Sequence, residues 1–383
     1  MELEVVDIET AAADAAWRHL YEEQESPANP FCAPNWIVTW YRHFVPEPGQ
    51  RRLCFIRSNA GDLLGVAPLW FDYDRVGPVR IATRLRLVGA GQGSALLEMP
   101  QVLAKPGQAR PILSLIVKEL ATPGSVLAGA DLMELIIADG QGWLEPEWPA
   151  IGNWAAASWN HVDAQAAVII PIGPTWTETL AGLKRNVKES LRRSRNRLSK
   201  RDRPWDVVRR GIDLDTAAVD RFLDLHGMRS QREGRAQHHD AFAQPERRRF
   251  IRELLPRLGA DGDAAIWELW LGGREVAAQL VLHAPGTLYV HSSGFDPSTW
   301  ELGPVTHLQE HAFRAACEDG LRWVNLSPGP NLAKLRWSER LLRHDEFWIS
   351  FGSGRTLLRQ SALAVGRALR VVKHNARLAE RAR

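Results

Sequence analysis

Histidines and runs of basic residues are the side chains of this 383-residue sequence that could do chemistry. His226 stands in an otherwise apolar stretch, where a histidine is either a general base or a hydrogen-bonded structural residue. His238, His239 and Asp240 are residue types that bind metals, but no further ligand follows at a metal-binding spacing. The sequence therefore predicts no metal site.

The three cysteines, Cys32, Cys54 and Cys317, are odd in number and widely spaced. This pattern predicts no disulfide framework and fits a reducing compartment such as the cytoplasm. Each cysteine is expected to be a small buried apolar residue rather than a nucleophile.

A basic segment follows a capping box in which Thr175 precedes Glu178 by three residues. One predicted helix runs from Thr175 to Pro204, with an apolar stripe on one face and a net charge of +8 over residues 184–203. It is either a solvated helix face or a surface that binds phosphates. The candidates for phosphate binding are Lys184, Arg185, Lys188, Arg192, Arg193 and Arg195.

Charge is divided unevenly along the chain. Residues 1–174 contain 12 Lys or Arg and 20 Asp or Glu, a net of −8, and residues 175–383 contain 36 and 25, a net of +11. The second half is therefore expected to meet an anion. No run approaches the ~20 apolar residues of a membrane helix, and the acidic N-terminus does not resemble a signal peptide.

The segment 264–327 has the clearest pattern of secondary structure. Two β-rich runs flank Gly272-Gly273, which predicts a hairpin because glycine accepts the positive φ of tight turns. A helix that crosses over between two later strands is expected to make them parallel. The predicted elements are strands at 265–271, 275–283, 287–293 and 322–327 and a helix at 304–317.

Several motifs of this segment together resemble a known family. They are Gly273-Arg274-Glu275-Val276-Ala277-Ala278, Tyr289-Val290-His291-Ser292-Ser293-Gly294-Phe295-Asp296, Leu302-Gly303-Pro304-Val305 and the stretch from Leu326 to Trp337. The set is similar to the GNAT-superfamily acetyltransferases of the CelD/BcsL type, which are related to the FemAB/FemX peptidyltransferases. The resemblance implies an α/β (α+β) fold with a mixed, mostly antiparallel sheet and flanking helices.

A second hairpin, at 53–70, repeats the hairpin at 266–281 and predicts two copies of one fold. FemX-like proteins have twin GNAT domains, which agrees with this repeat. The expected units are an acidic N-terminal domain at 1–174, a basic C-terminal domain at 175–353 that holds the acyl-transfer cleft, and a basic helical tail at 354–383. The tail is expected to dock on the body or to make a weak contact with anionic membranes or nucleic acid.

The resemblance also implies a site. His291, on the strand that would line the cleft, is the first candidate for base or substrate positioning, and Lys334 matches a family lysine that would stabilise an oxyanion or bind phosphate. Asn325 stands where the family usually has Asp, so an acid or base is not expected at that position. Donor-binding candidates are Ser293, Gly303, Val305 and Arg336.

The predicted function is therefore N-acyl transfer by direct attack onto an amine of a small-molecule or glycan-linked acceptor, with no tightly bound cofactor. The co-substrate is acyl-CoA or aminoacyl-tRNA, with a slight preference for aminoacyl-tRNA, because Pro304 and a single glycine make a poor pyrophosphate cradle. Two alternatives stay open: a non-catalytic nucleic-acid-binding protein on this scaffold, and an accessory protein of polysaccharide biosynthesis.

Overall fold

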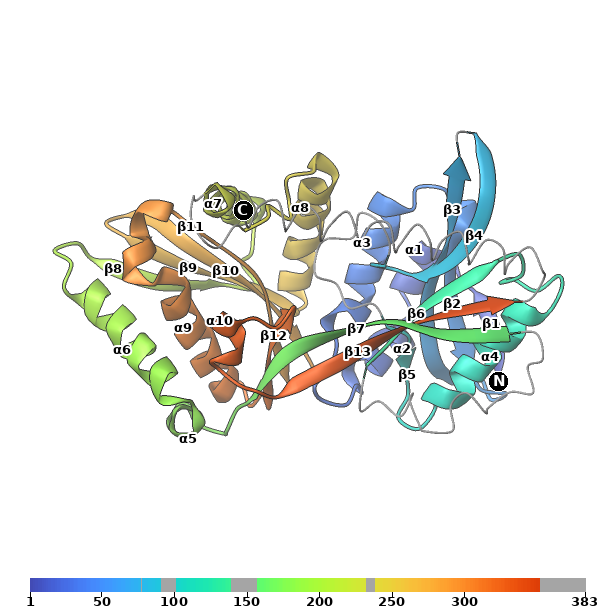
Figure 1. Ribbon diagram of the computed structural model, residues 1–383, viewed down its shortest axis with the longest axis horizontal. Coiled ribbons are helices and arrows are strands. Elements are labelled where there is room, and N and C mark those ends of the chain that lie inside the picture. Colours follow the sequence, from blue (N-terminus) through green and yellow to red (C-terminus); the bar gives the residue numbers. More distant parts are fainter. Residues whose placement is uncertain (77, 91–100, 139–156, 232–237, 352–383) are drawn as a thin grey trace, which may run out of the picture.

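One mixed sheet runs through the whole molecule (Figure 1). The computed structural model describes residues 1–76, 78–90, 101–138, 157–231 and 238–351. Within them the strands lie in the order β1-β2-β3-β4-β6-β13-β7-β12-β11-β10-β9-β8, and β5 pairs with β3. Their bounds are β1 Glu2–Val5, β2 Arg51–Arg57, β3 Leu63–Val76, β4 Val79–Leu87, β5 Leu103–Ala104, β6 Leu132–Ala138, β7 Ala157–Pro171, β8 Trp205–Arg210, β9 Ala264–Leu271, β10 Arg274–Ala284, β11 Thr287–Phe295, β12 Trp323–Pro328 and β13 Leu341–Phe351.

Helices cover both faces of this sheet (Figure 1). In the described residues the α-helices are α1 Ile8–Ala12, α2 Ala15–Glu22, α3 Pro34–Phe44, α4 Ala109–Ala121, α5 Trp176–Gly182, α6 Arg185–Ser199, α7 Thr216–Ser230, α8 Pro245–Ala260, α9 Pro304–Glu318 and α10 Leu332–Leu335. The short 3₁₀ helices among the same described residues are η1 Pro30–Cys32, η2 Pro48–Gln50 and η4 Pro297–Leu302.

The two halves of the sheet repeat one topology. In the first half, β1 to β4 are antiparallel neighbours, α4 crosses over, and β6 pairs in parallel with β4. In the second half, β8 to β11 are antiparallel neighbours, α9 crosses over, and β12 pairs in parallel with β11. This confirms the predicted meander, its parallel crossover and the two copies of the fold.

The two halves exchange their last strands. β7 follows β6 in the chain but pairs antiparallel with β12 of the second half, and β13 follows β12 but pairs antiparallel with β6 of the first half. β7 and β13 also pair with each other along their length, and Figure 1 shows them crossing the centre of the molecule. Each half therefore depends on a strand of the other, and the predicted boundary at residue 174 lies between β7 and α5.

The predicted basic helix is wrong in one respect, because two helices replace it. Thr175 caps α5 by accepting the Glu178 N–H at 3.2 Å, as the capping box predicts. The chain then becomes extended at Leu183 and Lys184, with ψ angles of 152° and 148°, before α6 begins. Burial of Leu183 in the second-half core, directly after the weak helix former Gly182, accounts for this break.

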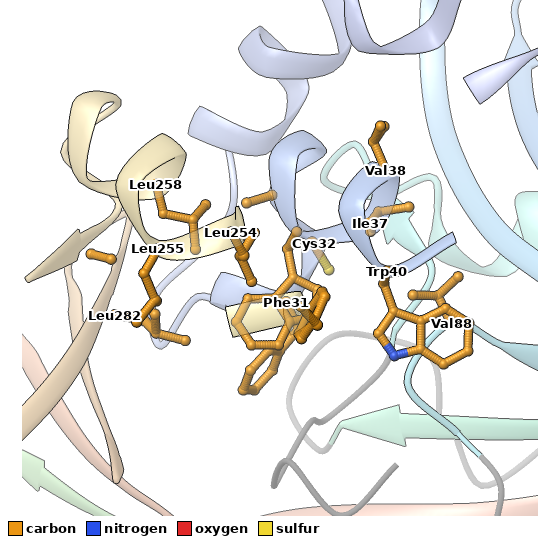
Figure 2. Close-up of a cluster of buried hydrophobic side chains, with 14 of the residues drawn as sticks. Phe31, Cys32, Ile37, Val38, Trp40, Val88, Leu254, Leu255, Leu258 and Leu282 are labelled. Atoms are coloured by element: carbon orange, nitrogen blue, oxygen red, sulfur yellow. The ribbon is translucent and has the colours of Figure 1, made fainter. Parts of the chain in front are cut away.

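A shared hydrophobic core joins the halves. Phe250 of α8 lies with its ring centroid 5.6 Å from that of Trp36 and 5.2 Å from that of Phe44, both on α3. Figure 2 shows this junction, with Phe31 and Trp40 on one side and Leu254 of α8 on the other. Burial of so many apolar side chains across one interface stabilises the halves as a single body.

Two further cores lie on the opposite face. One lies between the second half of the sheet and α5, α6 and α9, and the other lies beneath α4 in the first half. The strands β9 to β12 are thus covered by α7 and α8 on one face and by α5, α6 and α9 on the other (Figure 1).

Candidate functional site

The parallel pair β11–β12 is joined over only a short length. Its register runs from Thr287 opposite Trp323 to Tyr289 opposite Asn325, whereas β11 continues to Phe295. Residues 290–295 of β11 and 326–328 of β12 form what is called here the open end of the pair. Main-chain groups that leave a ladder become available to other partners, so this is a place where a sheet can bind a substrate.

His291 is the extra residue of a β-bulge at this open end. Leu280 of β10 faces Ser292, and Val281 faces Val290, so one additional residue lies between them on β11. A bulge bends its strand and redirects a side chain, and bulges are common beside active sites. The sequence-predicted candidate His291 therefore lies where the backbone geometry is irregular.

Both halves contribute to the surroundings of His291. Its imidazole is buried, with 4% exposure, and its Nδ1 lies 2.8 Å from the Oγ of Ser292. Its ring centroid is 6.3 Å from that of Phe31 and 6.1 Å from that of Trp36, which belong to η1 and α3. The second half holds the histidine, and the first half supplies aromatic side chains beside it.

Lys334 holds the end of β12. Its ammonium donates to the carbonyl and the hydroxyl of Ser327, both at 3.1 Å, and to the carbonyl of Pro328 at 2.7 Å. Ser327 has a left-handed backbone, with φ at 65°, and its N–H donates to Oδ1 of Asn325 at 2.9 Å. Burial lowers the pKa of Lys334 to about 8. The side-chain amide of Asn325 thus stabilises the backbone turn at Ser327.

His226 lies at the same open end, where it contacts β11 from α7. Its Nδ1 donates to the carbonyl of Ser293 at 3.0 Å, and its Nε2 accepts the N–H of Ala241 at 3.4 Å. Burial lowers the pKa of His226. Both ring nitrogens are therefore engaged with the main chain, which favours the structural alternative over the base for this residue.

Arg229 is a residue of the site that the sequence-based prediction missed. Its guanidinium donates to the carbonyl of Ser293 at 2.9 Å and to the Ser293 hydroxyl at 2.5 Å, and it lies 5.7 Å from the ring centre of Phe295. Burial lowers its pKa to about 10, so it stays charged at neutral pH. His226 and Arg229 are three residues apart and therefore lie on one face of α7, and this spacing indicates that both side chains contact the same group.

Gly294 allows α7 to approach β11 this closely. A Cβ at this position would lie 2.3 Å from the backbone nitrogen of His226 and 2.5 Å from the carbonyl carbon of Leu225. Any larger residue would push α7 away and separate His226 and Arg229 from Ser293. Of the predicted donor-binding residues, Ser293 thus lies beside His291 and already accepts two donors.

Gly303 and Val305 lie at the start of α9, which α6 covers. The hydroxyl of Ser194 on α6 donates to the carbonyls of Leu302 and Gly303 at 3.1 and 3.0 Å. Gly303 is the N-cap with φ at 67°, and Pro304 follows at the first helical position, where it has no N–H to offer. The first turn of α9 is thus a poor cradle for a phosphate, as the sequence predicts.

Most of the predicted phosphate-binding residues have protein partners. Arg185 and Arg193 pair with Glu189 on the same helix, and Arg195 lies 3.5 Å from Glu310 of α9. Lys184 bonds to Leu335 and Glu339, and Lys188 bonds to the Ala181 carbonyl. Arg192 is exposed and has no hydrogen bond or ion pair among the described residues. These side chains lie along α6, away from the His291 bulge.

Arg336 lies directly after α10, two residues past Lys334. It is half-buried, its guanidinium carbon is 6.0 Å from the ring centre of Trp337, and burial lowers its pKa. Its Nε has no hydrogen-bond partner in the part of the chain that the structure describes. The Nε–H of Arg336 is therefore available to donate to an additional acceptor group.

No set of three or more His, Cys, Asp and Glu side chains within the described ranges could hold a metal ion. The ring of His238 instead lies 3.0 Å from a guanidinium nitrogen of Arg229. None of the helices in the described ranges is both long enough and apolar enough to span a bilayer. The basic tail at 354–383 lies outside the described residues.

The equivalent position in the first half is occupied by an apolar residue. The parallel pair β4–β6 ends at Arg86 opposite Glu134, as β11–β12 ends at Tyr289. Two residues further along, the first half has Val88, buried in the shared core, where the second half has His291. The candidate histidine therefore belongs to the second half, with aromatic residues of the first half beside it.

Comparisons with known proteins agree with this division. Residues 185–335 match the family model described as an acetyltransferase (GNAT) domain. The crystal structure of FemX is similar to the chain with a TM-score of 0.60 at 14% identity, covering 90% of this chain and 97% of that one. A conserved protein of unknown function from Bacteroides thetaiotaomicron is similar with a TM-score of 0.55 at 12% identity, covering 92% and 100%. No curated protein matches the chain in sequence.

Residues 185–335 thus match an acetyltransferase (GNAT) domain, and the fold of the chain as a whole is similar to that of FemX. The matched residues include the His291 bulge, Arg229 and Lys334. The predicted twin GNAT-like architecture is confirmed.

Proposed function

We propose that this protein forms an amide by direct attack of an amine on an activated acyl carbonyl. The observation that carries the proposal is the open end of the β11–β12 pair, with His291 at its bulge and Lys334 bound at the end of β12. Burial raises the pKa of Cys32 and Cys54 to about 12, so neither supplies a thiolate nucleophile. Direct attack needs no covalent intermediate on the protein.

The proposed step assigns one task to each group. The attacking amine loses its proton to His291, the new N–C bond forms, and the bond from the acyl carbon to the leaving oxygen of the donor breaks. His291 then returns the proton to that leaving oxygen. Main-chain N–H groups at the open end of β11 and the ammonium of Lys334 stabilise the negative charge that develops on the carbonyl oxygen.

Ser292 has a supporting part in this proposal. Its hydroxyl lies 2.8 Å from Nδ1 of His291, close enough to orient the imidazole. In direct attack Ser292 holds the ring and does not accept the acyl group. A covalent route through Ser292 would use the same contact, so the two routes are separated by experiment.

The contacts of α6 support aminoacyl-tRNA as the donor. Acyl-CoA would need its pyrophosphate at the start of α9, where Pro304 lacks an N–H and the side chain of Ser194 lies against the loop at Leu302 and Gly303. An aminoacyl ester on tRNA requires no pyrophosphate there, and the net charge of +11 on residues 175–383 suits a polyanion. The acceptor is proposed to be an amine on a small molecule or on a glycan-linked compound, in the cytoplasm where charged tRNA is present.

The deciding experiment measures donor binding by the full-length protein. Filter binding with charged tRNA and calorimetry with acetyl-CoA would be run at 50 and 200 mM salt. The proposal expects salt-sensitive tRNA binding and no saturable CoA signal. Micromolar CoA binding without tRNA affinity would overturn the donor assignment and return α6 to a purely structural role.

A further inference from the structure

His43 of α3 lies between two carboxylates that belong to the other half of the molecule. Its Nδ1 is 2.7 Å from Oε1 of Glu246, and its Nε2 is 2.9 Å from Oε2 of Glu253. Both glutamates are on α8 and lie on one face of that helix, two turns apart. Figure 1 shows α3 of the first half beside α8 of the second half. One side chain of the first half thus contacts the second half through both of its ring nitrogens.

The partners of His43 determine which protonation state completes this arrangement. The hydrogen bonds from Arg249 and then from His43 lower the pKa of Glu246. Burial of Glu253 opposes such a shift, but its hydrogen bond with His43 and the charge of Arg257 lower its pKa as well. An ionised carboxylate only accepts hydrogen bonds, and a neutral imidazole has a single N–H. Both contacts are therefore hydrogen bonds only when His43 is an imidazolium.

The other charged side chains that face this group are arginines and one more glutamate. Arg42 of α3 pairs with Glu9 of α1 and lies 3.6 Å from Glu253. On α8, Arg249 pairs with Glu246, and Arg257 lies 3.0 Å from Glu253. Arginine stays charged throughout the range in which histidine titrates. His43 is therefore the member of this group that changes its charge near neutral pH.

Ring contacts connect His43 to the candidate site. Phe250 lies on α8 between the two glutamates, and its ring centroid is 5.8 Å from that of His43 and 5.6 Å from that of Trp36. The ring centroid of Trp36 is in turn 6.1 Å from that of His291. Because packed side chains move together, a shift of α3 along α8 would move Trp36 relative to His291.

We propose that His43, Glu246 and Glu253 form a pH-dependent latch that fixes α3 against α8 and thereby positions Trp36 beside His291. The protonated ring donates to both glutamates. In the neutral ring one nitrogen carries a lone pair that faces a carboxylate oxygen, so one hydrogen bond is lost. Histidine is the side chain that changes charge between pH 5 and 8, so the latch holds in mild acid and weakens as the pH rises. The latch is independent of the function proposed above, whereas its effect on turnover depends on that function.

The first measurement is NMR of the full-length protein labelled with ¹⁵N-histidine, between pH 5 and 9. His43→Gln identifies the ring signals of His43. We expect both ring nitrogens to be protonated at the acidic end of this range. Glu246→Gln and Glu253→Gln should each lower the midpoint of this titration by about half a pH unit, because a partly exposed ion pair contributes a fraction of the free energy of one pH unit.

Urea unfolding at pH 6 and pH 9 tests the coupling to stability. A proton shared by His43 with two carboxylates stabilises the folded state at low pH, and this contribution is lost as the ring becomes neutral. His43→Gln should therefore fall further below wild type in its urea midpoint at pH 6 than at pH 9. The matched control is His19→Gln, because His19 is 74% exposed and pairs with Glu23 on its own helix. The control should show no such difference.

The ring signals of His291 test the positioning of Trp36 without any assay of activity. They should differ between wild type and His43→Gln at pH 6 and converge at pH 9, where the latch is open in both. The ratio of kcat/KM of wild type to that of His43→Gln should follow the same course, from about threefold or more at pH 6 to close to one at pH 9.

The outcomes keep the latch and the proposed function apart. A His43 ring with one protonated nitrogen throughout the pH range, or an equal loss of urea midpoint at pH 6 and pH 9, would overturn the latch. Identical His291 signals in wild type and His43→Gln at pH 6 would overturn the positioning of Trp36. A protein without acyl-transfer activity would end the proposed function, while the NMR and urea results would still decide the latch.

Discussion

The ammonium of Lys334 makes three hydrogen bonds at the end of β12, two of them to the carbonyl and hydroxyl of Ser327. Ser327 is the one non-glycine residue in the described chain with a positive φ, at 65°. A left-handed serine is strained and persists when its surroundings over-determine it. Lys334 therefore has two tasks to be distinguished: holding this strained turn and stabilising charge in the reaction.

Replacing Lys334 separates these tasks. Lys334→Met should lower kcat about 100-fold if the ammonium stabilises the oxyanion, because loss of one such donor commonly costs that much. Lys334→Arg keeps the charge and should recover part of the rate. The measurement is steady-state kinetics beside a urea unfolding curve for each variant. A variant that loses stability but keeps kcat would leave Lys334 a structural residue only.

The pH dependence of activity gives an independent test of Lys334. Its pKa is lowered to about 8, so the rate should fall as pH rises through 8 and the ammonium loses its proton. Between pH 8 and the ordinary lysine pKa the unfolded chain binds more protons than the folded one. This group therefore raises the free energy of unfolding across that window as pH rises. A loss of rate without any loss of the unfolding midpoint would support the assignment, and a flat rate profile from pH 7 to 10 would contradict it.

Variants of His291 and Ser292 test direct attack. His291→Ala should lower kcat by about 10² to 10⁴, the range for loss of a general base. Ser292→Ala should keep most of the activity, because the hydroxyl only orients the ring. Mass spectrometry of the protein mixed with donor alone should show no added acyl group. An acyl group that appears in wild type and disappears in Ser292→Ala would replace direct attack with a covalent route.

His226 is expected to matter for stability rather than for rate. Its two ring nitrogens bond to Ser293 and to the N–H of Ala241, so His226→Ala leaves a buried acceptor and donor without these partners. Loss of such bonds costs about 1–3 kcal/mol of the free energy of unfolding. Urea unfolding measures this change, and kcat at a temperature where both proteins are folded should differ by less than about threefold. A 100-fold loss of kcat with normal stability would make His226 the base.

Buried histidines should make the protein sensitive to mild acid. His307 of α9 is 1% exposed, neither ring nitrogen has a hydrogen-bond partner among the described residues, and burial first, then His311 and Arg195, lower its pKa to about 4. The unfolded chain binds this proton near pH 6.5, so the free energy of unfolding falls as pH drops from about 6.5 to 4.

His307→Phe should reduce this acid effect. The variant removes one proton-binding site from the unfolded state, so its stability should differ less between pH 7 and pH 5. His283 is buried in the same way, with its pKa also lowered to about 4, so part of the effect remains. Urea midpoints at the two pH values measure the difference. An identical loss of stability in wild type and His307→Phe would exclude His307 as a source.

The shared core should make the halves unfold together. Phe250→Ala removes contacts with Trp36 and Phe44 and should cost about 3–5 kcal/mol. Phe313→Ala, which opens the second-half core beside Trp337, is the matched control. Circular dichroism and tryptophan fluorescence should report one coincident transition in both variants. Two separated transitions in Phe250→Ala would show that the exchanged strands alone do not couple the halves.

Much of the second half could be predicted from local patterns. The Gly272-Gly273 turn, the alternation of the flanking strands and the Gly303-Pro304 helix start are determined by residues close in sequence, and each element forms as expected. The motif around His291 predicted a strand, which β11 forms, and the missing N–H at the start of α9 was predictable because Pro304 is a proline.

Only the tertiary structure decided the partners of these elements. β7 and β13 were not predicted as strands from the sequence. Any edge of the sheet offers them the same main-chain bonds, so their exchange depends on packing across more than a hundred residues. The same holds for side chains. His226 and Arg229 converge on one carbonyl because Gly294 admits α7, and Ser194 closes the start of α9 because α6 packs against it. The type of each side chain determined what it can donate, accept or pack against. Long-range packing decided which of these side chains are already engaged within the protein and which remain accessible to a substrate.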